Sequence, residues 1–224
     1  MEVQEKRPHI RAVVFLCASF ILVAQAATAT AAYTYSFSQI VNDDADPDRG
    51  LVGETQLFMD VEASGAAVLF TFRNIGPEAS SIADIYFDDG LDSILEVITS
   101  IDDSHPGVSF TVGASPPDLP RWNNLVSPFT ADLAADSDPA VQPNGVSPNE
   151  WVGITVSLFG TNSLTDVIAY LNDATLRVGL HVQGYACGGS ESFVNNGLVP
   201  APGAMLLGSA GVACLGWIRH RRYL

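Results

Sequence analysis

The chain has 224 residues, of which 47% are hydrophobic, and a formal charge of −15 at pH 7. Residues 33–198 carry most of this imbalance, because they contain 23 acidic residues, four arginines and no lysine. Binding to nucleic acid depends on Lys and Arg contacts with phosphates, so a surface this acidic excludes nucleic acid as a partner. The composition is typical of a soluble protein that works outside the cell.

The N-terminus has the pattern of a secretory signal peptide. Lys6, Arg7 and Arg11 form a basic region, residues 12–24 form an apolar one, and small residues with Ala-x-Ala-like sites follow. The apolar stretch is short for a membrane span, and its flanks suit cleavage. We therefore expect residues 1–32 to be a signal peptide, cut within residues 26–33, and the protein to be exported.

The segment after it is long enough to bury the core of one domain. Apolar and polar residues alternate with a period of two in several stretches, which is typical of half-buried strands. Ser64-Gly65 between the first two stretches predicts a hairpin. The predicted strands are 55–61, 68–73, 81–88, 94–101, 108–112, 151–159, 175–183 and a short one at 192–194.

One short helix is expected among these strands. Leu164, Val167, Ile168 and Leu171 stand at helical spacing, and they follow Ser163, a residue type favoured at helix N-caps. Short strands separated by turn signals, with one minor helix, predict an all-β fold. We expect a single antiparallel β-sandwich, either immunoglobulin-like or a jelly-roll.

A proline-rich segment, residues 113–150, predicts a long irregular connection. Trp122 and Phe129 within it are candidates for a loop that faces a carbohydrate ligand; the alternative is that they anchor the loop by packing. Cys187 is the only cysteine in residues 33–198, so no disulfide can form within that segment. A buried, inert cysteine is the expectation.

The densest acidic run is residues 42–50, in which Asp44, Asp46 and Asp48 alternate with other residues. Calcium prefers such hard oxygen ligands, and EF-hand loops place them at alternate positions. Arg49 stands where that motif requires glycine and Thr55 where it requires glutamate, so the EF-hand motif is broken. The alternatives are a calcium loop of another kind, with the three aspartates as ligands, and a solvated turn; no other cofactor is expected.

Signals for catalysis are weak. His105 and His181 are the only histidines in residues 33–198, and neither has the spacing of a zinc site. Residues 188–192 resemble a nucleophile loop only superficially, because no serine stands in a Gly-x-Ser-x-Gly elbow. We expect that the protein is not an enzyme. A secreted hydrolase that uses pairs of carboxylates is an alternative.

The C-terminal tail has three parts: a proline-containing motif, an uncharged run over residues 203–218, and a basic cluster. As a helix at about 1.5 Å per residue, the run would span roughly 24 Å, a little less than the ~30 Å hydrocarbon core. The arginines would stay on the cytoplasmic side. The motif and the basic cluster consist of Val199, Pro200, Ala201, Pro202, Arg219, Arg221 and Arg222.

This tail resembles the PEP-CTERM sorting signal of exported bacterial proteins, with Ala201 in place of the usual glutamate and His220 within the basic cluster. The resemblance implies that an exosortase-like sorting enzyme is a partner. It also implies that a transmembrane helix over 203–218 holds the protein at the membrane until cleavage near the motif releases it to the cell surface or extracellular polymer. The alternative is a permanent anchor that is never cut.

Three parts are therefore expected: a signal peptide (1–32), an exported acidic β-sandwich domain (33–198) and a sorting tail (199–224). The function that this organisation favours is a structural or adhesive protein of the cell surface or extracellular matrix, associated with exopolysaccharide. A carbohydrate-binding module is the first alternative, and a secreted hydrolase is the second.

Overall fold

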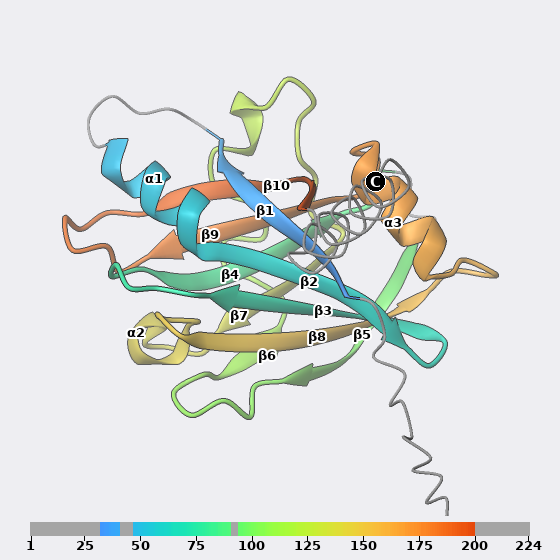
Figure 1. The fold of residues 1–224 in the computed structure, drawn as a ribbon, viewed down its shortest axis with the longest axis horizontal. Coiled ribbons are helices and arrows are strands. Elements are labelled where there is room, and N and C mark those ends of the chain that lie inside the picture. Colours follow the sequence, from blue (N-terminus) through green and yellow to red (C-terminus); the bar gives the residue numbers. More distant parts are fainter. Residues whose placement is uncertain (1–31, 41–46, 91–93, 200–224) are drawn as a thin grey trace, which may run out of the picture.

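The computed structural model describes residues 32–40, 47–90 and 94–199 (Figure 1). The expected signal peptide, apart from residue 32, and the sorting tail after Val199 lie outside the described residues. Asp44 and Asp46 of the acidic run also lie outside them. None of the helices in the described ranges is both long enough and apolar enough to cross a membrane.

Within these ranges ten strands form one antiparallel sheet, so the all-β prediction is confirmed. The sheet bends over so that its two edge strands approach each other (Figure 1). Whether it corresponds to an immunoglobulin-like or jelly-roll sandwich stays a prediction. From edge to edge the strands are β5 (Leu95–Asp102), β8 (Glu150–Leu158), β3 (Ala67–Asn74), β2 (Leu57–Ser64), β1 (Tyr33–Gln39), β10 (Glu191–Val199), β9 (Arg177–Gln183), β4 (Ser81–Asp88), β7 (Leu133–Ser137) and β6 (Phe110–Val112).

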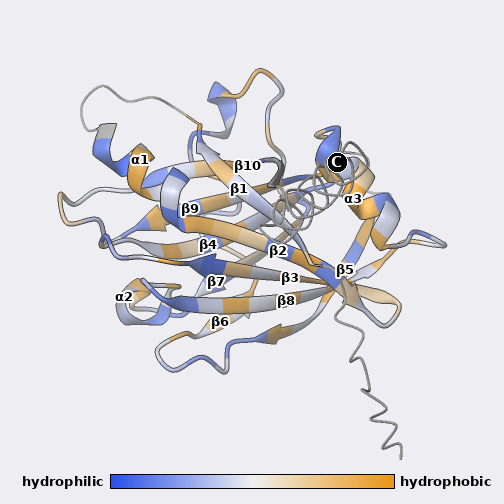
Figure 2. Ribbon diagram, viewed as in Figure 1, coloured by the Kyte–Doolittle hydropathy of each residue, from blue (hydrophilic) through white to orange (hydrophobic). Residues whose placement is uncertain are grey.

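The two halves of the sheet face each other across a shared core. Phe70 of β3 and Phe87 of β4 meet edge to face with ring centroids 5.1 Å apart, although their strands belong to different halves. Figure 2 shows hydrophobic and hydrophilic residues mixed along the same strands, as expected when one face of a strand is buried. Burial of these apolar side chains is the main contribution to stability.

The predicted hairpin is confirmed in β2 and β3. The register pairs Leu57 with Asn74 and Ser64 with Ala67, so the chain reverses through the two residues between these strands. Gly65 in that turn has a φ of 65°, which glycine adopts at little cost. Alternate residues of both strands are buried, in agreement with the period of two.

Strand β4 is buried on both faces along its whole length. Ile85 and Phe87 belong to the main core, whereas Tyr86 packs with Leu119 and Phe129 in a second, smaller core. Residues 113–132 therefore cover the outer face of the sheet at this point; we call them the covering loop. Its side chains come so close to Gly179 of β9 that a Cβ there would meet Leu119 at 2.6 Å.

The helix expected after Ser163 is confirmed as α3 (Leu164–Asn172). The carboxylate of Asp166 accepts the Ser163 backbone N–H at 2.9 Å, which satisfies a donor at the start of the helix. Strand β8, just before it, agrees with the predicted strand at 151–159 to within a residue at each end.

Other predictions were wrong in part. Residues 113–150 are not one irregular connection, because they contain η1 (Trp122–Asn124), β7 and α2 (Val141–Asn144). The strand expected from residue 55 begins at Leu57, after a helix that was not predicted, α1 (Pro47–Gln56). Strand β1 was not predicted either.

Helix α1 was not predicted because it contains glycines, and glycine is a poor helix former. Packing explains the glycine at position 53. A Cβ there would collide with the fully buried ring of Phe193, so α1 can lie against β10 only with glycine at this position. A Cβ on Gly50 would meet only the flexible end of the Gln39 side chain.

Candidate functional site

Three titratable side chains form a row across the outer face of β9, β4 and β7. The strand register pairs Asp84 with His181 on one side and with Asp136 on the other. Nδ1 of His181 lies 2.7 Å from Oδ2 of Asp84, and these two side chains are only 9% and 4% exposed. We call this arrangement the carboxylate–histidine row.

The pKa of Asp136 is raised well above its ordinary value. Burial, reinforced by a hydrogen bond to Asp84 and by the charge of Asp84, raises the pKa of Asp136 to about 6. Oδ1 of Asp84 is buried and receives no hydrogen bond from a donor in the described part of the chain. Because burial and the charge of Asp84 both favour the neutral form of Asp136, this carboxyl accepts a proton more readily than an exposed aspartate does.

Ser192 of β10 stands opposite His181 in the register and extends the row. Serine, histidine and aspartate in this order match the nucleophile, base and acid of many hydrolases. However, the Ser192 hydroxyl makes no hydrogen bond to His181 or to any other described residue, and Ser192 is 1% exposed. A buried hydroxyl offers a substrate no access, so this geometry does not favour the hydrolase alternative.

Several hydrogen bonds and ion pairs hold the covering loop beside the row. The Tyr86 hydroxyl donates to the carbonyl of Pro116 at 2.9 Å. Arg177 forms an ion pair with Asp88 and donates to the carbonyls of Ser127 and Pro128, each at 2.6 Å. A planar guanidinium with several donors suits this role, because it can satisfy the carbonyls and the carboxylate together.

The two aromatic residues proposed to face a carbohydrate lie in different environments. Phe129 is 1% exposed, packs in the small core and carries the Arg177 guanidinium 5.3 Å from its ring centroid. It acts as a packing anchor of the covering loop. Trp122, on η1, is 39% exposed. Of these two aromatic residues, only Trp122 presents its ring to solvent, so the two do not form one platform.

Asp48 is the only one of the three proposed calcium ligands that the structure describes. It is exposed in the first turn of α1, where a carboxylate interacts favourably with the helix dipole. Within residues 32–40, 47–90 and 94–199, no group of three or more His, Cys, Asp or Glu side chains is arranged to hold a metal ion. Cys187, expected to be buried, is exposed, because it follows β9 in the surface turn that leads to β10.

Of the sorting motif, the structure describes only Val199, the last residue of β10. The other residues of the motif and the basic cluster lie outside the described ranges: Pro200, Ala201, Pro202, Arg219, Arg221 and Arg222.

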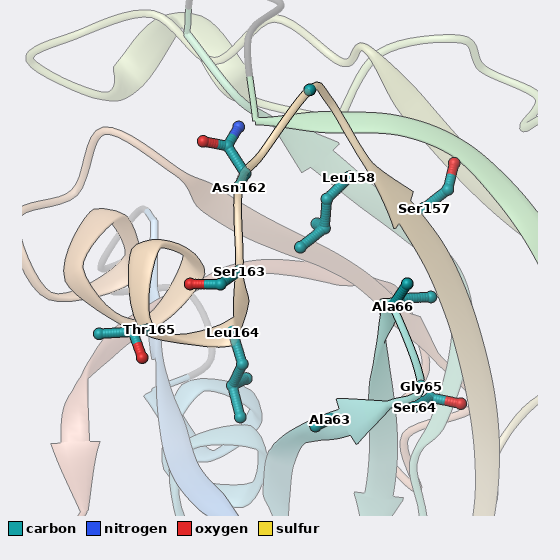
Figure 3. A pocket seen from close by; sticks show the side chains of 12 residues that line it. Ala63, Ser64, Gly65, Ala66, Ser157, Leu158, Asn162, Ser163, Leu164 and Thr165 are labelled. Carbon is teal, nitrogen blue, oxygen red and sulfur yellow. The ribbon is translucent and has the colours of Figure 1, made fainter.

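An open cleft between two loops is a separate candidate (Figure 3). The turn between β2 and β3 forms one wall, and the connection from β8 into α3 forms the other. Its volume is about 660 Å³, and none of its twelve lining residues is charged. No motif in the sequence predicts this cleft, because its walls consist largely of small residues in turns.

The two candidates differ in chemistry. The carboxylate–histidine row is buried and titratable, which suits a pH-dependent contribution to stability. The cleft is open and uncharged, which suits a neutral ligand. Sequence reasoning missed the row because Asp84 and His181 are 97 residues apart and only the sheet register brings them together. No protein-family model, curated protein or solved structure matches this chain.

Proposed function

We propose that the protein is an exported structural or adhesive component of the cell surface or extracellular matrix, sorted by its PEP-CTERM-like tail. The proposal rests on the positions of two neighbouring strands, β1 and β10. Strand β1 begins at Tyr33, β10 ends at Val199, and Thr34 pairs with Val199. Removal of residues 1–32 and of everything after Val199 would therefore leave all ten described strands in place.

The charge distribution supports a role outside the cell. The four arginines of residues 33–198 are engaged within the fold and leave little positive charge to balance the 23 acidic residues. A surface with this net charge stays soluble, and divalent cations can link it to acidic polysaccharides. The arginine contacts are Arg73 with Asp60, Arg121 with Glu191, Arg177 with Asp88, and Arg49 with the carbonyl of Gly188.

Intact mass and cell fractionation in the native host test the proposal. The double variant Pro200→Ala/Pro202→Ala is compared with the wild type, and Pro106→Ala, in an exposed turn outside the tail, is the control. We expect wild-type and control chains in the extracellular fraction to end within residues 199–202. The double variant should stay in the membrane fraction with its arginines attached.

Two outcomes would contradict the proposal. A wild-type chain that keeps residues 219–224 in the membrane fraction would be a permanently anchored domain, which refutes release. A wild-type chain found in the cytoplasm with residues 1–32 attached would refute export itself.

A carbohydrate-binding module is the second candidate, because the exposed Trp122 ring sits on a loop that hydrogen bonds hold in place. Polysaccharide pull-down with wild type and Trp122→Ala tests it. Binding that is lost in the variant would support this function, and absence of binding by the wild type to any polysaccharide would exclude it.

A further inference from the structure

The cleft in Figure 3 has the dimensions of a ligand site. Its volume of about 660 Å³ lies within the range of roughly 300–1,000 Å³ that is usual for small-molecule pockets. Gly65 lies in one wall and Gly160 in the other, and a Cβ added to either would meet no heavy atom within 4 Å. Side chains of the described residues therefore do not fill the space between the two turns.

The absence of charge in the cleft restricts the ligand. All twelve lining residues are neutral, in a domain with 23 acidic residues. The cleft cannot hold an anion or a cation through an ion pair, and the acidic surface around it disfavours anionic ligands at long range. A neutral ligand is the class that remains.

The lining combines apolar surface with hydroxyl groups. Leu158 points into the space between the walls in Figure 3, and Leu164 lies at the start of α3. Ser64 and Thr165 are exposed, one in each wall, and their hydroxyls make no hydrogen bond to the described residues. These two hydroxyls are therefore available to a ligand.

The other hydroxyls of the cleft are already engaged. Ser163 donates to Asp166 at 2.7 Å, and Ser157 donates to Glu96 at 3.1 Å.

We propose that this cleft binds a short segment of a neutral oligosaccharide. A sugar ring has apolar C–H faces and a rim of hydroxyls, which complement the leucine side chains and the two unengaged hydroxyls. Neither Trp122 nor the carboxylate–histidine row contributes. The inference goes beyond the proposed function and does not depend on it, because binding at the cleft requires neither export nor cleavage of the tail.

Isothermal titration tests the proposal on protein purified after expression of the full chain. The probes are cellohexaose, maltohexaose and mannohexaose, with an alginate hexamer as the charged comparison. Ala66→Trp places a large side chain in the cleft from an exposed turn position, and Thr165→Val removes one hydroxyl at nearly constant volume. Trp122→Ala is the control outside the cleft, and thermal denaturation verifies that each variant is folded.

In buffer without divalent cations, we expect at least one neutral hexaose to bind in the micromolar to millimolar range and the alginate hexamer not to bind. Thr165→Val should weaken binding roughly fivefold, the usual effect of one neutral hydrogen bond. Ala66→Trp should weaken it at least about tenfold, because it occupies the ligand's place. Trp122→Ala should leave it unchanged.

The proposal is overturned if folded wild-type protein binds none of the neutral probes at millimolar concentration, or if folded Ala66→Trp binds as well as the wild type. Binding that depends on Trp122 and not on Ala66 would place the site on the covering loop and also refute the cleft. A chain that binds neutral sugar but keeps its tail would refute sorting alone, so the two proposals fail separately.

Discussion

Replacing Asp136 with asparagine tests the carboxylate–histidine row through stability. The raised pKa of Asp136 means that the folded state disfavours its charged form. The contribution of this group to folding is fully present below its unfolded pKa near 3.8 and is lost as the pH rises through about 6. Asparagine stays neutral at every pH, so the variant should escape this loss.

The magnitude follows from the pKa. A carboxyl whose pKa rises from 3.8 to about 6 loses roughly 3 kcal/mol of stability on ionisation if it is fully buried. Asp136 is only half-buried, and solvent screening reduces this figure to about 1 kcal/mol. For a domain of this size, that amounts to a rise in Tm of roughly 2–4 °C.

Urea denaturation at pH 4 and pH 8 measures the effect. Asp118→Asn is the matched control, because it removes the same charge from an exposed site on the covering loop. We expect Asp136→Asn to be more stable than the wild type at pH 8 and nearly equal to it at pH 4, with Asp118→Asn close to the wild type at both. The reasoning is refuted if Asp136→Asn is less stable at pH 8, or if the control shows the same gain.

Three further predictions concern other parts of the fold. Asp84→Ala leaves His181 and Asp136 without their shared partner and should lower the free energy of unfolding, measured in urea, by about 3 kcal/mol. An unchanged midpoint of urea denaturation would contradict a stabilising role for the buried pair of Asp84 and His181. Gly53→Ala should lower the free energy of unfolding by about 1–3 kcal/mol, because the added Cβ collides with Phe193. Gly197→Ala is the control and should change it little, because its added Cβ meets no atom within 4 Å. Equal effects of the two variants would contradict the packing of α1 described above. If the acidic run holds calcium, millimolar Ca²⁺ should raise the wild-type Tm, and this rise should disappear in the triple variant; a Tm insensitive to Ca²⁺ would exclude the site. The triple variant combines Asp44→Asn, Asp46→Asn and Asp48→Asn.

Periodicity predicted those elements whose own residues determine their structure. The hairpin of β2 and β3 has strict alternation and a glycine in its turn, and α3 has apolar residues at helical spacing after a capping serine. Strand β1 carried a similar signal, since Tyr33, Tyr35 and Phe37 alternate with polar residues. It was overlooked because it directly follows the small residues of the expected signal peptide.

The elements that sequence could not predict depend on distant partners. Strand β7 consists of leucine, alanine, aspartate and serine, which have little β-propensity apart from the leucine, and it is a strand because it pairs with β4 and β6. Helix α1 contains a glycine, Gly53, that only the surface of β10 explains. The carboxylate–histidine row likewise exists only through the register of three strands.

The pairing of β1 with β10 imposes an order on folding. These are the first and last strands within the described residues, and they are the link between one half of the sheet and the other. The complete sheet cannot form until the residues up to Val199 have been synthesised and have reached the same compartment as Tyr33. Such long-range pairing is slow to form. Under the export proposed above, a chain that delays its final closure in this way would stay unfolded while it is threaded through a secretion channel, and its sheet would be completed on the far side.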